Sequence, residues 1–409
     1  MSPPILLAAT MNTKGAEALY LDRAIRAGGA QLLSMDLSMR YGEGPLKADI
    51  TADEVARAGG SSLKELSGSR DMAANMETMV GGASLIASKL MADGKIGGII
   101  GIGGYTGTFV ITPVMQVLPF GLPKVMVSSA AAMRGLSSLF LKTSDIMFFH
   151  SVVEIAGLPN LVRNILERAA CAVCAMVRGP VVYSKIAEQR AVAMTMMSPC
   201  EKCASFVRSA LETEGYEVVG FHANGVGDRA MEEMIGAGHF DGVIDLAPGG
   251  VGENLYGFAR DSGPDRLEAA GKRGVPQIIS TCGVNHVTPM GSHPAFSGRP
   301  RYELDRLRTW LRATPGELRK ISEVFAFKLN RSVGPVKVVI PLRGWSSVDS
   351  PGNPTYDPEG DIVFSRTLRK KLKREIEIVE VDANMEDIEF SRAIVNAASE
   401  LFDGHNATS

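Results

Sequence analysis

Cysteine and excess charge are scarce in this sequence of 409 residues. The five cysteines are an odd number for a long chain, which argues against a disulfide scaffold and for a reducing, cytoplasmic location. Lysine and arginine number 43, and aspartate and glutamate number 45, so the net charge is −2. Without a basic excess, the chain has no electrostatic basis for binding nucleic acid or an anionic membrane.

The sequence also lacks targeting and membrane-spanning features. Its N-terminus has no basic region and only a short apolar stretch, so it is not expected to be a signal peptide. One uncharged stretch, residues 96–123, is long enough to cross a bilayer, but glycines and prolines interrupt it. We interpret it as a buried strand, a glycine-rich loop and a buried helix.

What the sequence does contain is an alternation of strands and helices. At about 150 residues per domain, the length predicts two to three domains. Short apolar runs followed by helical patterns occur near the start and again after residue 190. These strand, helix and strand series are expected at residues 5–10, 16–27 and 31–35, and at residues 191–197, 204–213 and 217–221. Such units build a parallel sheet.

We therefore predict an α/β protein with two Rossmann-like, doubly wound parallel-sheet domains. The expected ranges are 1–180 and 190–409, with the boundary within 178–190. KIGGIIGIGGYTG, starting at Lys95, matches HFDGVIDLAPGGV, starting at His239, in its order of helix end, strand and Gly-Gly loop. This similarity indicates either a duplication or the general likeness of doubly wound domains.

The first candidate binding loop, TMNTKG, follows the first predicted strand. Ligands of open parallel sheets bind beyond the carboxyl ends of the strands, and a helix N-terminus suits an anion. We expect MNTKG to be a turn-rich loop that opens a helix. It is either a phosphate site or a helix cap with a solvent-facing lysine. The candidate residues are Thr10, Asn12, Thr13, Lys14 and Gly15, together with Asp36 after the second strand.

A glycine-rich loop after the strand at 98–102 is the second candidate. Glycines let backbone N–H groups approach a phosphate closely. The spacing fits neither the Rossmann fingerprint nor a Walker A loop. A third loop follows the strand at 124–127 and lines the same edge. The candidates in these two loops are Gly103, Gly104, Tyr105, Thr106, Gly107 and Thr108, with Ser128 and Ser129.

Histidine and cysteine supply the candidates in the second half. His222 and His286 each end a predicted strand, where a histidine serves as a catalytic base, as a ligand or as a structural residue. Cys200 follows Pro199 in a predicted loop, SPCEKC, at a helix N-terminus that would lower the pKa of its thiol. It is either a nucleophile or a residue that lines a site. Cys171 and Cys174 lie in an apolar helical run and are expected to be buried rather than zinc ligands.

A long loop, RGWSSVDSPGNPTYDPEGD, follows the strand predicted at 336–340. Loops of this length within a domain are either functional or disordered. Burial of Trp345 and Tyr356 would order it. Asp349, Asp357 and Asp361 are then candidates for contact with a ligand hydroxyl, a metal or a neighbouring subunit, or else turn formers. A strand at 376–381 and a helix near 387–402 complete the chain.

Taken together, these stretches resemble a largely uncharacterised family of bacterial and plant proteins, which includes the ATP-binding N-terminal domain of a tomato mosaic virus resistance protein. The motifs that carry the resemblance run along the whole chain: TMNTKG, DITADEVARAGG, GIGGYTGT, LPFGLPKVMVSSAA, SDIMFFHSVVEIAGL, FHANGVGDRAME, GPDRLEAAGKRGVPQ and PLRGWSSVDSPGNPTYDPEGD. The resemblance implies ATP in the first domain, at the TMNTKG and GGYTGT loops. It also implies assembly as a homodimer or a higher homo-oligomer.

Several positions depart from the family pattern. The family usually has Asp at Asn12, Ser at Tyr105 and Asp near Asn285, and it has a His-Asn pair where Leu304 and Asp305 stand. These departures put a family-wide chemistry of the second half in doubt. An asparagine at position 12 also holds Mg²⁺ less strongly than a carboxylate would.

The function expected from the sequence is binding of ATP, with Mg²⁺ as a further candidate, by a metabolic enzyme. A cleft in the second half would take a small carboxylate or carbonyl compound, in a ligase, kinase-like or carbonyl-processing reaction. Arg70, Arg229 and Arg266 are candidate anion partners or solvated surface residues. The alternative is a non-catalytic, nucleotide-dependent binding protein.

Overall fold

The computed structural model describes residues 3–42, 44–179, 190–290, 296–306 and 308–406. Most of the boundary region expected at 178–190 lies outside the described residues. Contacts between residues divide the chain into two compact units, Met1–Ser184 and Lys185–Ser409. We refer to them as the first and the second domain and describe each by itself.

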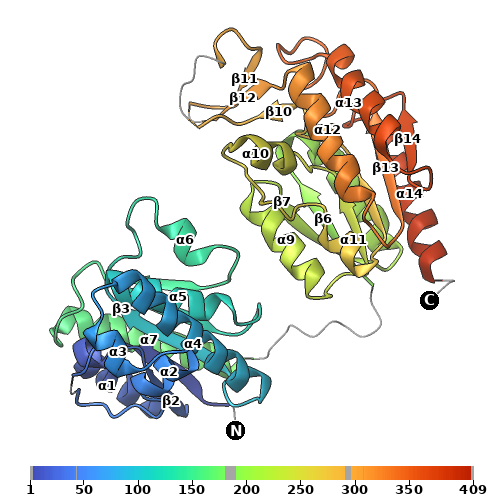
Figure 1. Ribbon diagram of the computed structural model, residues 1–409. Coiled ribbons are helices and arrows are strands. Elements are labelled where there is room, and N and C mark those ends of the chain that lie inside the picture. Colours follow the sequence, from blue (N-terminus) through green and yellow to red (C-terminus); the bar gives the residue numbers. More distant parts are fainter. Residues whose placement is uncertain (1–2, 43, 180–189, 291–295, 307, 407–409) are drawn as a thin grey trace. The chain divides into compact units, whose positions relative to one another are not determined.

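A parallel sheet forms the centre of the first domain, with helices packed around it (Figure 1). The sheet has five strands. Its strands stand in the order β2-β1-β3-β4-β5. The strands are β1 (Ile5–Ala9), β2 (Leu32–Asp36), β3 (Gly98–Gly103), β4 (Lys124–Ser128) and β5 (Met147–His150). The three central strands, β1, β3 and β4, are buried along their whole length, because helices cover both faces.

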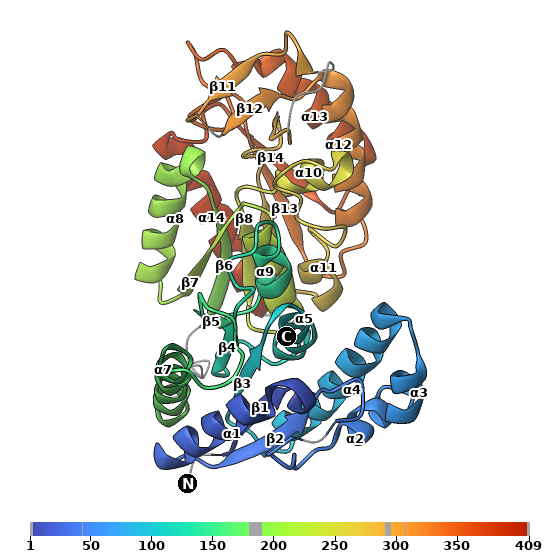
Figure 2. The same ribbon diagram turned by 90° about the vertical axis from the view of Figure 1, so that its left-hand side faces the viewer.

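Successive residues of β1 belong to two different cores. Leu6 and Ala8 face α2, α4 and α5, whereas Ile5 and Leu7 face α1 and α7. The helices of this domain are α1 (Met11–Ala27), α2 (Ala52–Ala58), α3 (Leu63–Gly68), α4 (Met72–Ala92), α5 (Tyr105–Gln116), α6 (Ser137–Leu141) and α7 (Asn160–Arg178). Figure 2 shows α7 and α4 on opposite sides of the sheet.

The second domain repeats this arrangement with one more strand. Its parallel sheet has the order β14-β13-β9-β8-β6-β7. Read from β7, the first five strands follow the same order as the five strands of the first sheet. The strands are β6 (Ala191–Met196), β7 (Glu217–His222), β8 (Gly242–Asp245), β9 (Gln277–Ile279), β13 (Val336–Pro341) and β14 (Glu377–Val381). The prediction of two doubly wound parallel-sheet domains is confirmed.

Helices again cover both faces of the second sheet. One core lies under α8 and α14, and two others lie under α9 with α11 and under α12 with α13. The helices are α8 (Glu201–Thr213), α9 (Val226–Gly236), α10 (Gly250–Tyr256), α11 (Ala269–Arg273), α12 (Pro315–Leu329), α13 (Pro358–Lys371) and α14 (Ile388–Asn406). Thr314 begins α12 with a reciprocal capping box to Glu317.

A small antiparallel sheet is inserted between β9 and α12. It consists of β10 (His286–Val287), β11 (Arg301–Glu303) and β12 (Thr309–Arg312), in the order β10-β12-β11. The sequence analysis did not predict these strands, because each is only two to four residues long. The insertion pairs His286 with Arg312 across β10 and β12.

Three local predictions were wrong in extent. MNTKG is not a loop but the first turn of α1, which is distorted at Lys14 (φ −122°, ψ 18°). SPCEKC is also helical: a short 3₁₀ helix, η1 (Ser198–Cys200), leads directly into α8. The end of the long loop, PEGD, is the first turn of α13, where proline is favoured because its missing N–H needs no partner.

The stretch at 96–123 forms the strand β3 and the helix α5, as predicted. Its glycine-rich loop is reduced to Gly104, because β3 ends at Gly103 and α5 begins at Tyr105. In the part of the chain that the structure describes, no helix combines the length and the apolar character needed to cross a bilayer.

Candidate functional site

An open pocket of about 350 Å³ lies at the carboxyl edge of the first sheet. Two of the predicted loops meet there. Thr10, Asn12, Thr13 and Lys14 line it from the start of α1, and Gly104–Gly107 line it from the start of α5. Met39, Arg40 and Met72 complete the lining.

The pocket lies where the strand order of the first sheet reverses. The chain passes from β1 outward to β2 in one direction, and β3 then pairs on the other side of β1. Loops that follow two such strands diverge and leave a crevice between them, which is the usual ligand site of open α/β sheets. The pocket's position therefore follows from the topology.

The N-terminus of α5 provides hydrogen-bond donors to this pocket. Within the described part of the chain, the backbone N–H groups of Tyr105, Thr106 and Gly107 have no hydrogen-bond partner. Gly103 makes this turn possible, since a Cβ there would stand 2.8 Å from the Cα of Gly107. The positive end of the helix dipole adds to these N–H groups, so this turn suits an anion.

The N-terminus of α1 is different from what we expected. Its first backbone N–H groups are already used within the protein: Met11 donates to Asp36 Oδ1 at 3.0 Å and Asn12 donates to Ser38 Oγ at 3.1 Å. The N–H groups of Thr13 and Lys14 both donate to the carbonyl of Thr10. This segment therefore offers side chains to the pocket rather than backbone N–H groups.

Two cationic side chains line the pocket. The ammonium group of Lys14 donates to the carbonyl of Ile155 and lies 3.8 Å from a carboxylate oxygen of Glu154. The side chain of Arg40 is exposed and has no ion pair or hydrogen bond to the described residues. Arg40 follows β2, at the same edge of the sheet, so its position in the strand order was the signal that the sequence analysis missed.

The other predicted residues of the first domain do not line the pocket but form hydrogen bonds and packing contacts next to it. Asp36 fixes Met11 and both polar groups of Ser38. Gly15 packs against Pro45. The last three predicted residues form hydrogen bonds beside the pocket. Thr108 and Ser128 share a buried hydrogen bond of 2.6 Å, and Ser129 donates to Glu154 at 3.3 Å.

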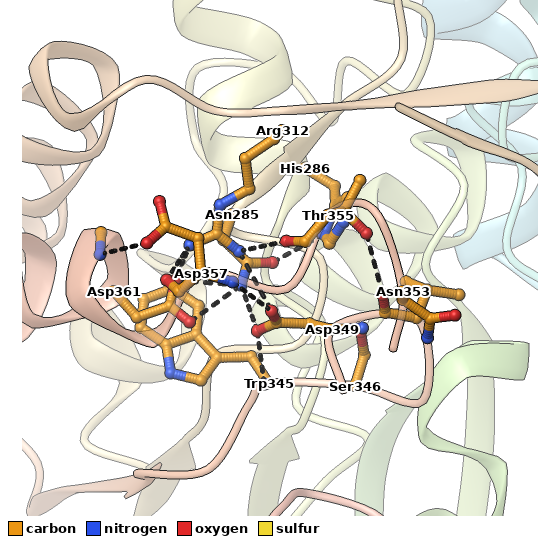
Figure 3. A network of polar contacts seen from close by, with 12 residues as sticks. Asn285, His286, Arg312, Trp345, Ser346, Asp349, Asn353, Thr355, Asp357 and Asp361 are labelled. Carbon is orange, nitrogen blue, oxygen red and sulfur yellow. Dashed lines mark hydrogen bonds and ion pairs between the residues drawn. The ribbon is translucent and has the colours of Figure 1, made fainter. Parts of the chain in front are cut away.

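A second group of polar residues lies beyond the carboxyl ends of β9 and β13 in the second domain (Figure 3). We call it the Arg312 cluster; it consists of Asn285, His286, Arg312, Asp349 and Asp361. The Arg312 guanidinium pairs with Asp361 and with Asp349, the latter at 3.3 Å. It also donates to the carbonyls of Thr355 and Asp357.

Burial dominates the electrostatics of this cluster. It raises the pKa of Asp361 well above its usual range, and Asp349 adds to this effect while Arg312 opposes it. Burial also lowers the pKa of His286 well below its usual value, and the positive charges of Arg312 and Arg260 lower it further. The imidazole of His286 is therefore neutral at physiological pH.

The two predicted histidines are in different surroundings. His286 is only 2% exposed, whereas His222 is exposed at the end of β7, with Nδ1 3.3 Å from the carbonyl oxygen of Met196. His286 borders a narrow hollow lined by Met197, Pro199, Arg260, Gly283, His286, Trp310, Ser346 and Val348. We call it the His286 hollow. His222 does not line it.

Cys200 and Asp357 have structural contacts. Cys200 is completely buried and its thiol faces the carbonyl of Met197 at 3.3 Å, so the thiol is not accessible in this conformation. Asp357 caps α13 by accepting from the N–H of Gly360 at 2.9 Å. Trp345 is buried and Tyr356 is half-buried, so the long loop is ordered as we expected.

The candidate anion partners of the second domain are also engaged. Arg266 is buried and pairs with Asp228, Glu232 and Asp245, so it is neither available to a ligand nor solvated, contrary to both sequence interpretations. Arg229 lies 3.5 Å from Asp261 on the surface. Arg260, which the sequence analysis did not single out, is the cation that borders the His286 hollow.

Comparison with known proteins identifies relatives along the whole chain. A UPF0261 protein of Clostridium tetani is 34% identical over 398 residues, covering 96% of this chain and 98% of the relative. A UPF0261 protein of Rhizobium meliloti is 32% identical and covers 97% and 98%. The tomato ToMV resistance protein Tm-1(GCR237) is 32% identical over 316 residues, covering 75% of this chain and 42% of that protein.

Among solved structures, a UDP-N-acetylglucosamine 2-epimerase from Rickettsia bellii matches with a TM-score of 0.24 and 7% identity, over 100% of this chain and 99% of that chain. This similarity is too low to support an inference about function. Two family models match the sequence itself. They describe the N-terminal domain of an uncharacterised protein family, UPF0261, at residues 3–181 and its C-terminal domain at residues 189–402. The chain therefore belongs to the UPF0261 family.

Proposed function

We propose that the first domain binds ATP, or a similar nucleotide phosphate, in the pocket between the starts of α1 and α5. The observation that carries this proposal is the set of unpaired backbone N–H groups of Tyr105, Thr106 and Gly107 beside two cationic side chains. The pocket's volume of about 350 Å³ falls within the range of about 300–1,000 Å³ that is common for small-molecule sites.

The donors in the pocket fit the parts of a nucleotide. Phosphate oxygens would accept from the α5 N–H groups and from Arg40, whose guanidinium suits bidentate phosphate contacts. The ring of Tyr105 is 52% exposed at the rim and is supported by Phe109, with 4.7 Å between the ring centroids. An exposed ring held in this way offers a surface for stacking a base.

Magnesium fits the pocket less well. Among the described residues that line it, none carries a carboxylate, and Asn12 and the threonines supply neutral oxygens. Since Mg²⁺ is usually held by one or two carboxylates together with substrate phosphates, we assign it no role.

Calorimetry with ATP tests the site. We expect Arg40→Ala and Lys14→Ala each to weaken binding by about 1–3 kcal/mol, the usual cost of losing a charge-assisted hydrogen bond. Lys64→Ala is the control, because Lys64 is exposed on α3 and does not line the pocket. Wild-type affinity in both pocket variants would place the nucleotide elsewhere, and no binding by the wild type would refute the proposal.

Whether the nucleotide is turned over decides between the two functional classes. The proposal favours a metabolic enzyme that acts on a small carboxylate or carbonyl compound and assembles as a homo-oligomer. The alternative is a protein that binds the nucleotide without reaction. Measuring ATP consumption with a panel of small acids distinguishes them: release of ADP or AMP that depends on one acid indicates an enzyme, and binding without release indicates the alternative.

A further inference from the structure

The His286 hollow lies where a parallel sheet would place a ligand. Part of its lining comes from the segments that follow β6, β9 and β13, at the carboxyl edge of the second sheet, and Arg260 and Trp310 come from other segments. Three strands therefore contribute residues to one point. The hollow is a candidate for the second-half cleft that the sequence predicted for a small carboxylate or carbonyl compound, and binding there does not require a nucleotide in the first domain.

The Arg312 cluster fixes the position of the proton on His286 (Figure 3). The side-chain nitrogen of Asn285 donates to Asp349 at 2.7 Å and to Asp361 at 3.0 Å. Two carboxylates thus orient the amide, and its oxygen faces Nδ1 of His286 at 2.7 Å. An amide oxygen only accepts, so the proton of the neutral imidazole is on Nδ1. The other ring nitrogen, Nε2, is then a bare acceptor.

This acceptor is buried without a partner. Nε2 of His286 has no hydrogen bond to any described residue, although the residue is only 2% exposed. Buried polar atoms without a partner are rare in folded proteins, because leaving one unpaired costs about 1–3 kcal/mol. A ligand group that donates a hydrogen bond, such as a hydroxyl, would satisfy it.

Arg260 supplies the opposite kind of group on the same hollow. Its Nε donates to Thr288 and its Nη2 to Glu253 at 2.7 Å, whereas its Nη1 contacts the sulfur of Met197 at 3.2 Å. Sulfur is a weak acceptor, so Nη1 keeps its capacity to bind an anion. The guanidinium also lies over the ring of Trp310, with 5.7 Å to the centroid, which holds it in place.

We propose that the His286 hollow binds a small hydroxy acid, whose hydroxyl donates to Nε2 of His286 and whose carboxylate meets Nη1 of Arg260. The remaining walls, from Pro199, Gly283 and Val348, are apolar or backbone. The hollow has no space for a water molecule in this conformation, so the ligand is small and Ser346 and Val348 move to admit it. The N–H of Ser347 donates to the carbonyl of Pro199 at 2.9 Å, and this bond opens on entry.

Nuclear magnetic resonance of the imidazole nitrogens in the full-length protein tests both the position of the proton on His286 and the contact of Nε2 with a ligand hydroxyl. His286→Gln assigns the signal, and we expect the wild type to show a neutral ring with its proton on Nδ1. Glycolate and lactate should shift the Nε2 signal, whereas propionate, which lacks the hydroxyl, should leave it unchanged. A proton on Nε2, or an equal response to propionate and lactate, would overturn the proposal.

Calorimetry with lactate then measures the contact. His286→Gln should weaken binding about tenfold, the effect of one hydrogen bond. His150→Gln, at the exposed end of β5 in the first domain, should bind as the wild type does. Binding of lactate that is unaffected by His286→Gln, or no binding by the wild type, refutes the site. If the variant fails to fold, the comparison of lactate with propionate on the wild type still decides.

Discussion

The two sheets share a strand order but use their switch points differently. In the first domain, the loops after β1 and β3 diverge and leave an open pocket. In the second, the equivalent loops follow β6 and β8, and polar bonds close the space between them: Thr195 donates to Asp245 at 2.7 Å and accepts from the N–H of Ala247 at 2.9 Å. The topology thus gives a position for a crevice, and the side chains determine whether it stays open.

Glycines make the same contrast. Both domains place a Gly-Gly pair after the equivalent strand, as the matching sequences indicated. The first glycines of the two pairs are alike, since a Cβ on Gly103 would stand 2.8 Å from the Cα of Gly107 and a Cβ on Gly249 would lie 2.4 Å from the carbonyl oxygen of Gly283. The second glycines differ: a Cβ on Gly104 would meet no atom closer than 3.5 Å, whereas a Cβ on Gly250 would lie 2.3 Å from Oγ of Ser262. Only Gly104 borders open space.

The largest difference between the domains should appear on removal of an arginine. Arg312→Leu leaves Asp349 and Asp361 buried without their cation, so we expect a loss of about 3–5 kcal/mol in the free energy of unfolding. Urea unfolding followed by tryptophan fluorescence measures it, because Trp310 and Trp345, the two tryptophans of the chain, both lie in the second domain. Arg40→Leu, on the open pocket, should change stability by less than about 0.5 kcal/mol. Equal losses of stability in the two variants would contradict the proposed difference between the domains.

Alanine at the two glycines gives the next largest difference. Gly249→Ala forces two backbone segments apart and should destabilise the second domain by about 1–3 kcal/mol. Gly104→Ala should leave stability within about 0.5 kcal/mol of the wild type, since its Cβ has space. Thermal unfolding of both variants measures the difference. A stable Gly249→Ala protein would show that the second switch point can open.

Acidification should distinguish the domains through His286. Its pKa is lowered in the folded protein, so below about pH 6.5 His286 takes up a proton in the unfolded chain but stays neutral in the folded chain. Stability then falls as the pH drops, by at most about 1.4 kcal/mol per pH unit for one proton. The measurement is the difference in unfolding free energy between wild type and His286→Gln at pH 7 and pH 5. A difference that does not change with pH would mean that His286 titrates normally.

Thiol labelling is the mildest test, since it changes no contact. Cys171 is exposed on α7, contrary to our expectation, while Cys174, Cys200, Cys203 and Cys282 are buried. Burial also raises the pKa of the Cys203 thiol to about 12. Intact-mass measurement after brief treatment with iodoacetamide should find a single label, on Cys171. Rapid labelling of Cys200 would restore it as a nucleophile candidate and show that the second domain opens.

The sequence predicted what depends on short-range pattern. Apolar runs located the strands, and the rule that ligands bind beyond strand ends located TMNTKG and GGYTGT at one pocket. Local pattern did not indicate which N–H groups remain unpaired, because Asp36 and Ser38 reach Met11 and Asn12 from another strand. Cys171 was misjudged for a related reason: it lies on an apolar helix but on its exposed face.

The Arg312 cluster was beyond sequence reasoning for a different reason. Its members are separated by up to 76 residues, and two very short strands bring Arg312 beside His286. The sequence marked His286, it marked Asp349 and Asp361 in the long loop, and a departure from the family pattern marked Asn285. Nothing in the sequence indicated that these residues contact one another. Such networks depend on tertiary contacts, which produce no periodic pattern in the amino-acid sequence.

The orientation of the Asn285 amide decides the hydrogen-bond polarity of the second domain's hollow. Because the two carboxylates hold the nitrogen of the amide on their side, the imidazole presents an acceptor. Turning that amide by half a rotation would move the proton of His286 to the other nitrogen and present a donor instead. A change at Asp349 or Asp361, neither of which lines the hollow, is therefore able to exchange one class of ligand for another. The residues that determine which class of ligand binds in this domain therefore lie behind the surface that the ligand touches.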